Sequence, residues 1–124
     1  MTDSKLLDSS LWVAFAIENN EFNIINSEEK IFTSCLSIFE IKKKLLRDKI
    51  ETNKINKILD FIKKRSIVLQ IDEKTAEKAS EISLEKALPA IDSLIYSSAL
   101  LNNLTLITLD NDFRNLKNVQ VLEI

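Results

Sequence analysis

The sequence contains no histidine and no glycine, and it has one cysteine among its 124 residues. Without histidine there is no imidazole general base, no Ser-His-Asp triad and no histidine-based RNA cleavage. Without glycine there is no phosphate-binding loop of the Walker or dinucleotide-binding type. The lone Cys35 forms neither an internal disulfide nor a thiolate cluster for zinc. Catalysis would have to use carboxylates, hydroxyls, lysine and arginine, so we expect it to depend on a metal ion.

Long apolar runs are also absent. No stretch approaches the roughly 20 residues needed to cross a bilayer, and residues 1–5 lack the basic, apolar and small-residue order of a signal peptide. Hydrophobic residues make up 45% of the chain and charged residues 29%, which is the balance of a globular protein. We therefore expect a soluble, cytoplasmic protein that forms one domain over residues 1–124 and does not enter a membrane.

Short β-rich segments alternate with helical patterns along the whole chain. The predicted helices lie between the strands, and strict alternation of this kind favours an α/β fold. The expected architecture is a three-layer sandwich, in which a central, mostly parallel sheet of about five short strands carries helices on both faces. The predicted strands are approximately 4–8, 30–34, 67–71, 104–108 and 119–122, and the predicted helices are approximately 10–18, 35–49, 52–65, 73–87 and 89–101.

Several residues at the predicted helix ends are typical of capping positions. Ser9 or Ser10 is expected to cap the first helix, Thr52 the third and Asp72 the fourth. Pro89 suits the first turn of the last helix, where its missing N–H costs nothing. In the helix at 73–87 we expect four apolar residues to face the core, namely Ala76, Ala79, Ile82 and Leu84.

Four acidic residues stand where an apolar run ends or within an apolar helical segment. Asp8 and Asp110 follow the first and fourth predicted strands, and Glu40 and Asp92 lie in predicted helices. Ligands of open α/β sheets bind outside the carboxyl ends of the strands, so Asp8 and Asp110 should share one site. Burying carboxylates is costly unless they are paired. With no histidine present, the expected partner is a hard divalent cation held by oxygen ligands.

Structural explanations for three of these acids stay open. Asp8 could accept hydrogen bonds from the first amides of the following helix. Asp92, near a helix N-terminus, would be stabilised by the helix dipole. Glu40 could form an ordinary surface pair with Lys44, which is four residues further on.

Asp110 and Asp112 have an alternative of their own. They could shape an Asx turn or cap the short turn that follows. An EF-hand calcium loop beginning at Asp110 is excluded, because the required glycine and glutamate positions are occupied by Asn115 and Val121.

The basic residues are bunched although the formal net charge is −2. That net charge provides no bulk attraction to nucleic acid. The groups at 42–49 and 63–65 could simply be solvated helix faces. If a catalytic site lies beside them, Lys43, Lys44 and Arg47 would hold a nucleic-acid backbone without reading its sequence.

Four segments together resemble a PIN domain, and among PIN domains the VapC-type toxin ribonucleases. The segments are Leu6–Ser10, Thr33–Ile41, Ala90–Ala99 and Leu106–Phe113, which occur in the family's order over nearly the whole chain. Family members often have glycine before the fourth strand, where this chain has Leu101-Asn102-Asn103. Asparagine tolerates left-handed backbone conformations, so the turn should survive.

The resemblance implies an Mg²⁺- or Mn²⁺-dependent endoribonuclease. One ion would activate water for attack on a phosphodiester, and a second would stabilise the leaving oxygen. Asp8 is expected to be the central ligand, Asp112 an additional ligand or supporting acid, and the hydroxyls of Thr108 and Ser9 would orient a ligand or water. The expected catalytic and metal-binding acids are Asp8, Glu40, Asp92 and Asp110.

The resemblance also implies partners. These are an RNA substrate, often tRNA or rRNA, a small antitoxin protein, and a second copy of the chain in a homodimer. Trp12, Phe15 and Phe22 could contribute to a dimer face or pack in the core. Two other functions stay open, a non-catalytic PIN-like module that binds protein or RNA, and a housekeeping nuclease that processes RNA or acts on DNA.

Overall fold

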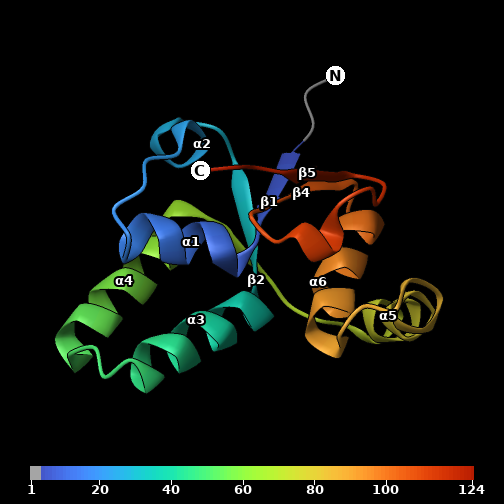
Figure 1. Cartoon of the computed structure of the whole chain (residues 1–124), viewed down its shortest axis with the longest axis horizontal. Coiled ribbons are helices and arrows are strands. Elements are labelled where there is room, and N and C mark those ends of the chain that lie inside the picture. Colours follow the sequence, from blue (N-terminus) through green and yellow to red (C-terminus); the bar gives the residue numbers. More distant parts are fainter. Residues whose placement is uncertain (1–3) are drawn as a thin grey trace.

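The computed structural model describes residues 4–124, so residues 1–3, part of the segment inspected for a signal peptide, lie outside it. A five-stranded sheet runs through the molecule in the order β3-β2-β1-β4-β5, and every neighbouring pair is parallel (Figure 1). The strands are β1 (Ser4–Leu7), β2 (Ile31–Ser34), β3 (Ile67–Leu69), β4 (Leu104–Thr108) and β5 (Val119–Val121). The predicted parallel sheet is confirmed.

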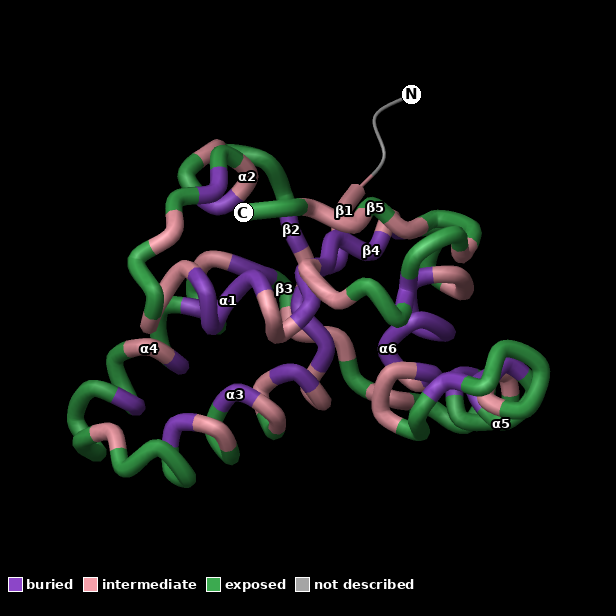
Figure 2. The backbone as a smooth tube through the Cα atoms, viewed as in Figure 1, coloured by how far each residue is buried: buried purple, intermediate pink, exposed green. Residues whose placement is uncertain are grey.

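Helices cover both faces of the sheet, as predicted. Neighbouring residues of β1 point to opposite faces, so Leu7 packs in one apolar cluster with α1, α3 and α4, while Leu6 packs in a second cluster with α5 and α6. Figure 1 shows α1, α3 and α4 on one side of the sheet and α5 and α6 on the other, and Figure 2 shows buried residues in the layers on both sides. The helices are α1 (Ser9–Ala16), α2 (Asn23–Asn26), α3 (Cys35–Arg47), α4 (Thr52–Arg65), α5 (Glu73–Lys86) and α6 (Ala90–Leu101), with a 3₁₀ turn, η1 (Asn111–Phe113), before β5.

The predicted caps are correct for one helix. Asp72 caps α5 and accepts a hydrogen bond from the Thr75 amide at 2.9 Å. The prediction for Thr52 is wrong, because Thr52 is already helical and Glu51 precedes it without a side-chain cap bond. Pro89 likewise stands one residue before α6, in an extended conformation, rather than in its first turn.

The prediction that Ser9 or Ser10 caps α1 is also wrong. Asp8 occupies the cap position, and its side chain makes no cap bond either. The Ser10 hydroxyl donates instead to Asp8 Oδ2 at 2.8 Å and accepts from the Leu109 amide at 3.0 Å. It therefore joins the start of α1 to the segment that follows β4.

Helix α5 buries a narrower stripe than predicted. Ala79 and Ile82 are buried as expected, but Ala76 is exposed and Leu84 is 89% exposed. The helix packs on α6 along one line of residues spaced by three or four, to which Thr75 belongs. Leu84 lies two residues beyond Ile82, and therefore on the opposite side of the helix.

Residues 19–29 show no clear strand or helix pattern in the sequence, yet they contain the short helix α2, which was therefore not predicted. Arg65 of α4 holds this segment by donating from Nε to the Ile25 carbonyl at 2.8 Å and from Nη2 to those of Ile24 and Ser27 at 2.9 and 3.0 Å. Arg65 thus has a structural use within the basic group at 63–65, whose other two members are exposed.

Three further expectations concern the aromatic residues, the glycine-free turn and the membrane. Trp12 and Phe22 are buried, and Phe15 is half-buried against the same cluster, which favours core packing. Asn103 adopts a left-handed conformation at φ 55°, so asparagine does replace glycine in that turn. Within residues 4–124, none of the helices is both long and apolar enough to span a bilayer.

Candidate metal centre

The carboxyl ends of β1 and β4 meet in the middle of the sheet. Strand order runs from β1 to β2 and β3 on one side and to β4 and β5 on the other, so the switch point lies between β1 and β4. The Asp8 amide donates to the Ile107 carbonyl at 2.9 Å, and Asp110 follows β4 by two residues. Asp8 and Asp110 therefore lie at neighbouring strand ends, as predicted.

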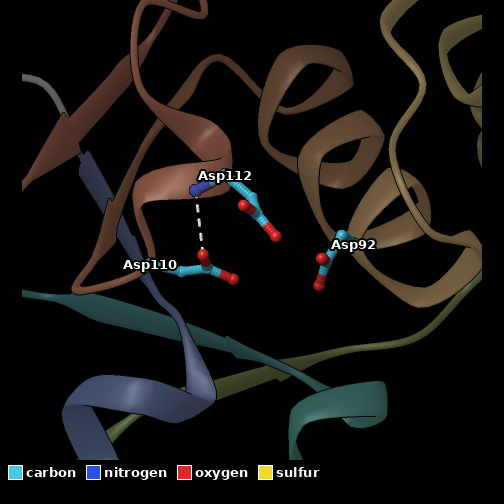
Figure 3. A group of neighbouring side chains, drawn as sticks. All are labelled: Asp92, Asp110 and Asp112. Atoms are coloured by element: carbon cyan, nitrogen blue, oxygen red, sulfur yellow. Dashed lines mark hydrogen bonds between the residues drawn. The ribbon is translucent and has the colours of Figure 1, made fainter.

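Three carboxylates converge beside this switch point. Each of Asp92, Asp110 and Asp112 offers an oxygen within 4.8 Å of the others, and Figure 3 shows them pointing into one space between α6 and η1. Asp92 lies in the first turn of α6, and Asp110 and Asp112 lie at the start of η1. We call these three residues the acidic group.

The turn predicted for Asp110 is present as well. Its Oδ1 accepts a hydrogen bond from the Asp112 amide at 2.9 Å and caps η1. A carboxylate has two oxygens with several lone pairs, so capping the turn is compatible with membership of the acidic group. The cap fixes the direction in which the Asp110 carboxylate points.

The electrostatics of Asp92 show that the predicted acids surround one place. Burial, which is the largest cause, and the negative charges of Asp8, Asp110, Glu40 and Asp112 together raise the pKa of Asp92 to about 6. Carboxylates that disfavour each other's ionised form are stabilised by a bound cation. The favourable dipole of α6 does not offset this effect of burial and like charge.

Glu40 approaches the same place from α3. Its Oε1 accepts a hydrogen bond from the Ser9 hydroxyl at 3.1 Å. Burial is the main cause that raises the Glu40 pKa, and the Asp8 and Asp110 charges add to it, whereas the Ser9 bond lowers it. The alternative surface pair with Lys44 does not form, because Lys44 Nζ lies 3.3 Å from Asp48 Oδ2 instead.

Asp8 is buried, and its carboxylate is held by hydroxyls. Its Oδ2 accepts hydrogen bonds from Ser10 and from Thr108 Oγ1, both at 2.8 Å. Thr108 Oγ1 also accepts from the Asp110 amide at 3.0 Å, so one hydroxyl links the two strand ends. Within residues 4–124, the close carboxylate group includes neither Asp8 nor Glu40. Sequence reasoning missed this use of Ser10, and its only signal was the place of Ser10 two residues after Asp8.

A groove of about 480 Å³ between α1 and α3 adjoins the site. Glu40 lines it, together with the three basic residues expected to bind a nucleic-acid backbone, Lys43, Lys44 and Arg47. We call it the basic groove. It meets the condition set by the sequence, namely that these basic side chains should lie beside a candidate catalytic site.

The sequence matches the family model described as the PIN domain over residues 5–119. A comparison with curated proteins finds no match.

Solved structures share the fold over nearly the whole chain. VapBC2 from Rickettsia felis, bound to a DNA fragment from its promoter, is similar with a TM-score of 0.79 and 19% identity, covering 96% of this chain and 97% of that one. A toxin–antitoxin complex from Klebsiella pneumoniae gives a TM-score of 0.71 and 19% identity, covering 97% and 99%. VapC20 from Mycobacterium tuberculosis, described as a Sarcin-Ricin loop cleaving toxin, gives a TM-score of 0.70 and 16% identity, covering 87% and 91%.

Proposed function

Because the chain belongs to the PIN domain family, we propose that it is a metal-dependent endoribonuclease and the toxin of a toxin–antitoxin pair. The observation that carries this proposal is the acidic group, where Asp92, Asp110 and Asp112 converge beside the switch point of a parallel sheet. Structures that share the fold come from toxin–antitoxin complexes and from an RNA-loop-cleaving toxin, which supports the same activity here.

The donor atoms fit Mg²⁺ or Mn²⁺. All three members of the acidic group offer carboxylate oxygens, which these hard cations prefer. Asp92, Asp110 and Asp112 would hold the ion, and Asp8 and Glu40 add negative charge beside it. When bound, such an ion supplies the Lewis acidity that phosphodiester hydrolysis needs.

The remaining residues of the site hold the carboxylates and bind the substrate. Ser9 fixes Glu40, and Thr108 fixes Asp8 and the Asp110 amide. Groups that are already oriented need no reorganisation during the reaction. Lys43, Lys44 and Arg47 of the basic groove bind the RNA backbone.

The proposal includes partners and a location. As a toxin, the protein would be inhibited by a small antitoxin, and it would act on RNA in the cytoplasm as a homodimer. Support for the antitoxin comes from the similar structures that are toxin–antitoxin complexes. A short neighbouring reading frame that encodes a DNA-binding protein would distinguish a toxin from a housekeeping nuclease.

The test is cleavage of total RNA by the purified protein with Mg²⁺, with Mn²⁺ and with EDTA. We expect cleavage only with a divalent ion, and a loss of at least about 100-fold in Asp92→Asn, because one ligand of the ion is removed. Asp60→Asn on α4 removes an exposed carboxylate outside the site and is the matched control. Equal cleavage by Asp92→Asn and the wild type would refute the mechanism.

Calorimetric titration with Mn²⁺ separates the proposal from the non-catalytic alternative. The nuclease should show a saturable signal that Asp92→Asn abolishes. A PIN-like module that only binds protein or RNA should show neither that signal nor cleavage. Cleavage of DNA without cleavage of RNA would identify the DNA-acting alternative.

A further inference from the structure

Phe39 is an exposed aromatic residue in the basic groove. Its side chain is 53% exposed, whereas Ile41 and Leu45 on the same helix are buried. It directly precedes Glu40, which contributes negative charge to the candidate metal centre. A ligand that covers this ring would remove apolar surface from water, which favours its binding.

A cation accompanies the ring. Lys43 lies four residues after Phe39, on the same face of α3, and its Nζ is 5.7 Å from the ring centroid. Lys44 and Arg47 also line the groove, although each approaches Asp48, at 3.3 and 3.9 Å. The groove therefore presents a flat apolar ring next to several positive charges.

This combination of groups matches one class of ligand. A nucleotide carries a flat aromatic base and an anionic phosphate, joined through a sugar. Aromatic rings bind bases by stacking, and adjacent lysine or arginine side chains bind the phosphates. A base that lies on Phe39 would be next to Glu40, whose charge acts on Asp92 of the acidic group.

We propose that Phe39 is the stacking platform for an unpaired base of a single-stranded nucleic acid lying in the basic groove. The inference rests on the proposed nuclease function and adds a residue that would contact a base of the substrate. A base inside a duplex is already stacked on both neighbours and cannot reach the ring, so the groove selects unpaired segments.

The lining of the groove favours a nucleic-acid strand over an apolar partner. Besides Phe39 and the three basic residues it is lined by the serines at 9 and 10, by two acids, Glu18 and Glu40, and by apolar residues such as Val13 and Ile91, so its lining is charged and polar as well as apolar. A second groove, of about 260 Å³ between α1 and α4, is more apolar and is lined by Trp12, Phe15 and Phe61. An apolar helix would fit that second surface better than the basic groove.

The test is binding of a fluorescent single-stranded RNA of about 12 nucleotides, measured by anisotropy in EDTA so that cleavage does not interfere. We expect Phe39→Ala to weaken binding by about 5- to 100-fold, the range found when stacking aromatics are replaced by alanine. Phe39→Trp should bind like the wild type, and Phe39→Leu should not. Leu46→Ala is the matched control, because Leu46 is 57% exposed on the same helix but does not line the groove.

Abasic scanning makes the test specific for stacking. Removing the base at one position of the RNA should weaken binding to the wild type and have no effect on Phe39→Ala. Single-stranded DNA should show the same dependence on Phe39, because stacking requires only the base, and a duplex of the same sequence should show none.

Each possible failure identifies which proposal is wrong. Equal binding by Phe39→Ala and the wild type, or abasic sites that act alike in both proteins, would overturn the stacking inference and leave the nuclease intact. The stacking inference would also be overturned if sedimentation shows that Phe39→Ala changes self-association while RNA binding per subunit stays unchanged. Absence of metal-dependent cleavage would instead refute the proposed function, while binding in EDTA still tests the stacking.

Discussion

At the scale of single residues, the site is a set of repelling carboxylates held by hydroxyls and amides. Ser9 donates to Glu40, the Asp112 amide donates to Asp110, and Asp8 receives two hydroxyl bonds. Asp92 is the acid whose ionisation burial and neighbouring charge disfavour most clearly, with a pKa of about 6. Without a bound cation, the ionised form of Asp92 is therefore destabilised in the folded protein.

The raised pKa of Asp92 predicts that the free energy of unfolding depends on pH. Between about pH 4, where an unfolded Asp ionises, and about pH 6, the folded protein holds a proton on Asp92 that the unfolded chain has lost. The contribution of Asp92 to the free energy of unfolding therefore falls as the pH rises through this window. In EDTA at pH 7, we expect Asp92→Asn to be more stable than the wild type by about 1 kcal/mol, after discounting for solvent screening of a half-exposed group.

Urea unfolding in EDTA at pH 4 and pH 7 measures this effect. The two proteins should differ little at pH 4 and clearly at pH 7. Adding Mn²⁺ at pH 7 should stabilise the wild type more than the variant, because the ion binds the folded carboxylates. An Asp92→Asn protein that is less stable than the wild type at pH 7 in EDTA would contradict the assignment.

At the scale of secondary-structure elements, Thr108 joins the ends of β1 and β4. Its hydroxyl donates to Asp8 Oδ2 and accepts from the Asp110 amide, so it orients acids from both strand ends. It is fully buried, and its donor cannot be replaced by solvent without rearrangement.

We expect Thr108→Val to affect stability and activity together. Valine has nearly the same shape but leaves the buried Asp8 carboxylate without one donor, which should cost about 1–3 kcal/mol of unfolding free energy. RNA cleavage should fall by roughly 10- to 100-fold, as when other groups that orient metal-site residues are lost. Urea unfolding and initial cleavage rates measure the two effects. Thr108→Ser keeps the hydroxyl and should retain both stability and activity. Thr105→Val on the same strand is the control. If Thr108→Val cleaves RNA as fast as the wild type, Thr108 does not orient the acids of the site.

The elements themselves could largely be predicted from the sequence, because strand and helix patterns are local. Asp72 is recognisable as a cap, since its amide partner lies three residues away. Helix α2 could not be predicted, because Arg65, about 40 residues later, holds it in place. The exposure of Leu84 depends on where α5 meets α6, which helical spacing alone does not determine.

The same limit applies to the candidate site. The sequence located Asp8, Asp92 and Asp110 on the correct elements, and folding places them around one point. It did not show which carboxylates converge most closely. That outcome depends on side-chain direction, and for Asp8 the direction is set by Ser10 and Thr108, which are 98 residues apart in sequence.

At the scale of the whole molecule, the charge distribution matters more than the net charge. The total is −2, yet the basic groove lies directly beside the acidic group. If the protein binds nucleic acid as proposed, the attraction would come from the basic residues of α3, because the net charge of the whole protein does not favour the approach.

This arrangement predicts a dependence on salt that arises from a few side chains. Each lost phosphate contact lowers the slope of log K against log salt by about 0.7 for a single strand. We expect Lys43→Ala and Arg47→Ala each to lower the slope by about this amount and to weaken binding to all sequences alike. Lys63→Ala, an exposed lysine on α4 outside the groove, should leave the slope unchanged. Anisotropy titrations at several salt concentrations measure these slopes. If the slope changes equally in all three variants, the phosphate contacts are not confined to the basic groove.

The parallel pairing of β1 with β4 also determines when, during translation, the site can form. Thr108 and Asp8 are hydrogen-bonded although 100 residues separate them, and Asp110 and Asp112 follow later still. A nascent chain whose β4 has not left the ribosomal exit tunnel has no assembled acidic group. If ribosomal RNA is among the substrates, the ribosome is thereby protected from the polypeptide that it is still synthesising.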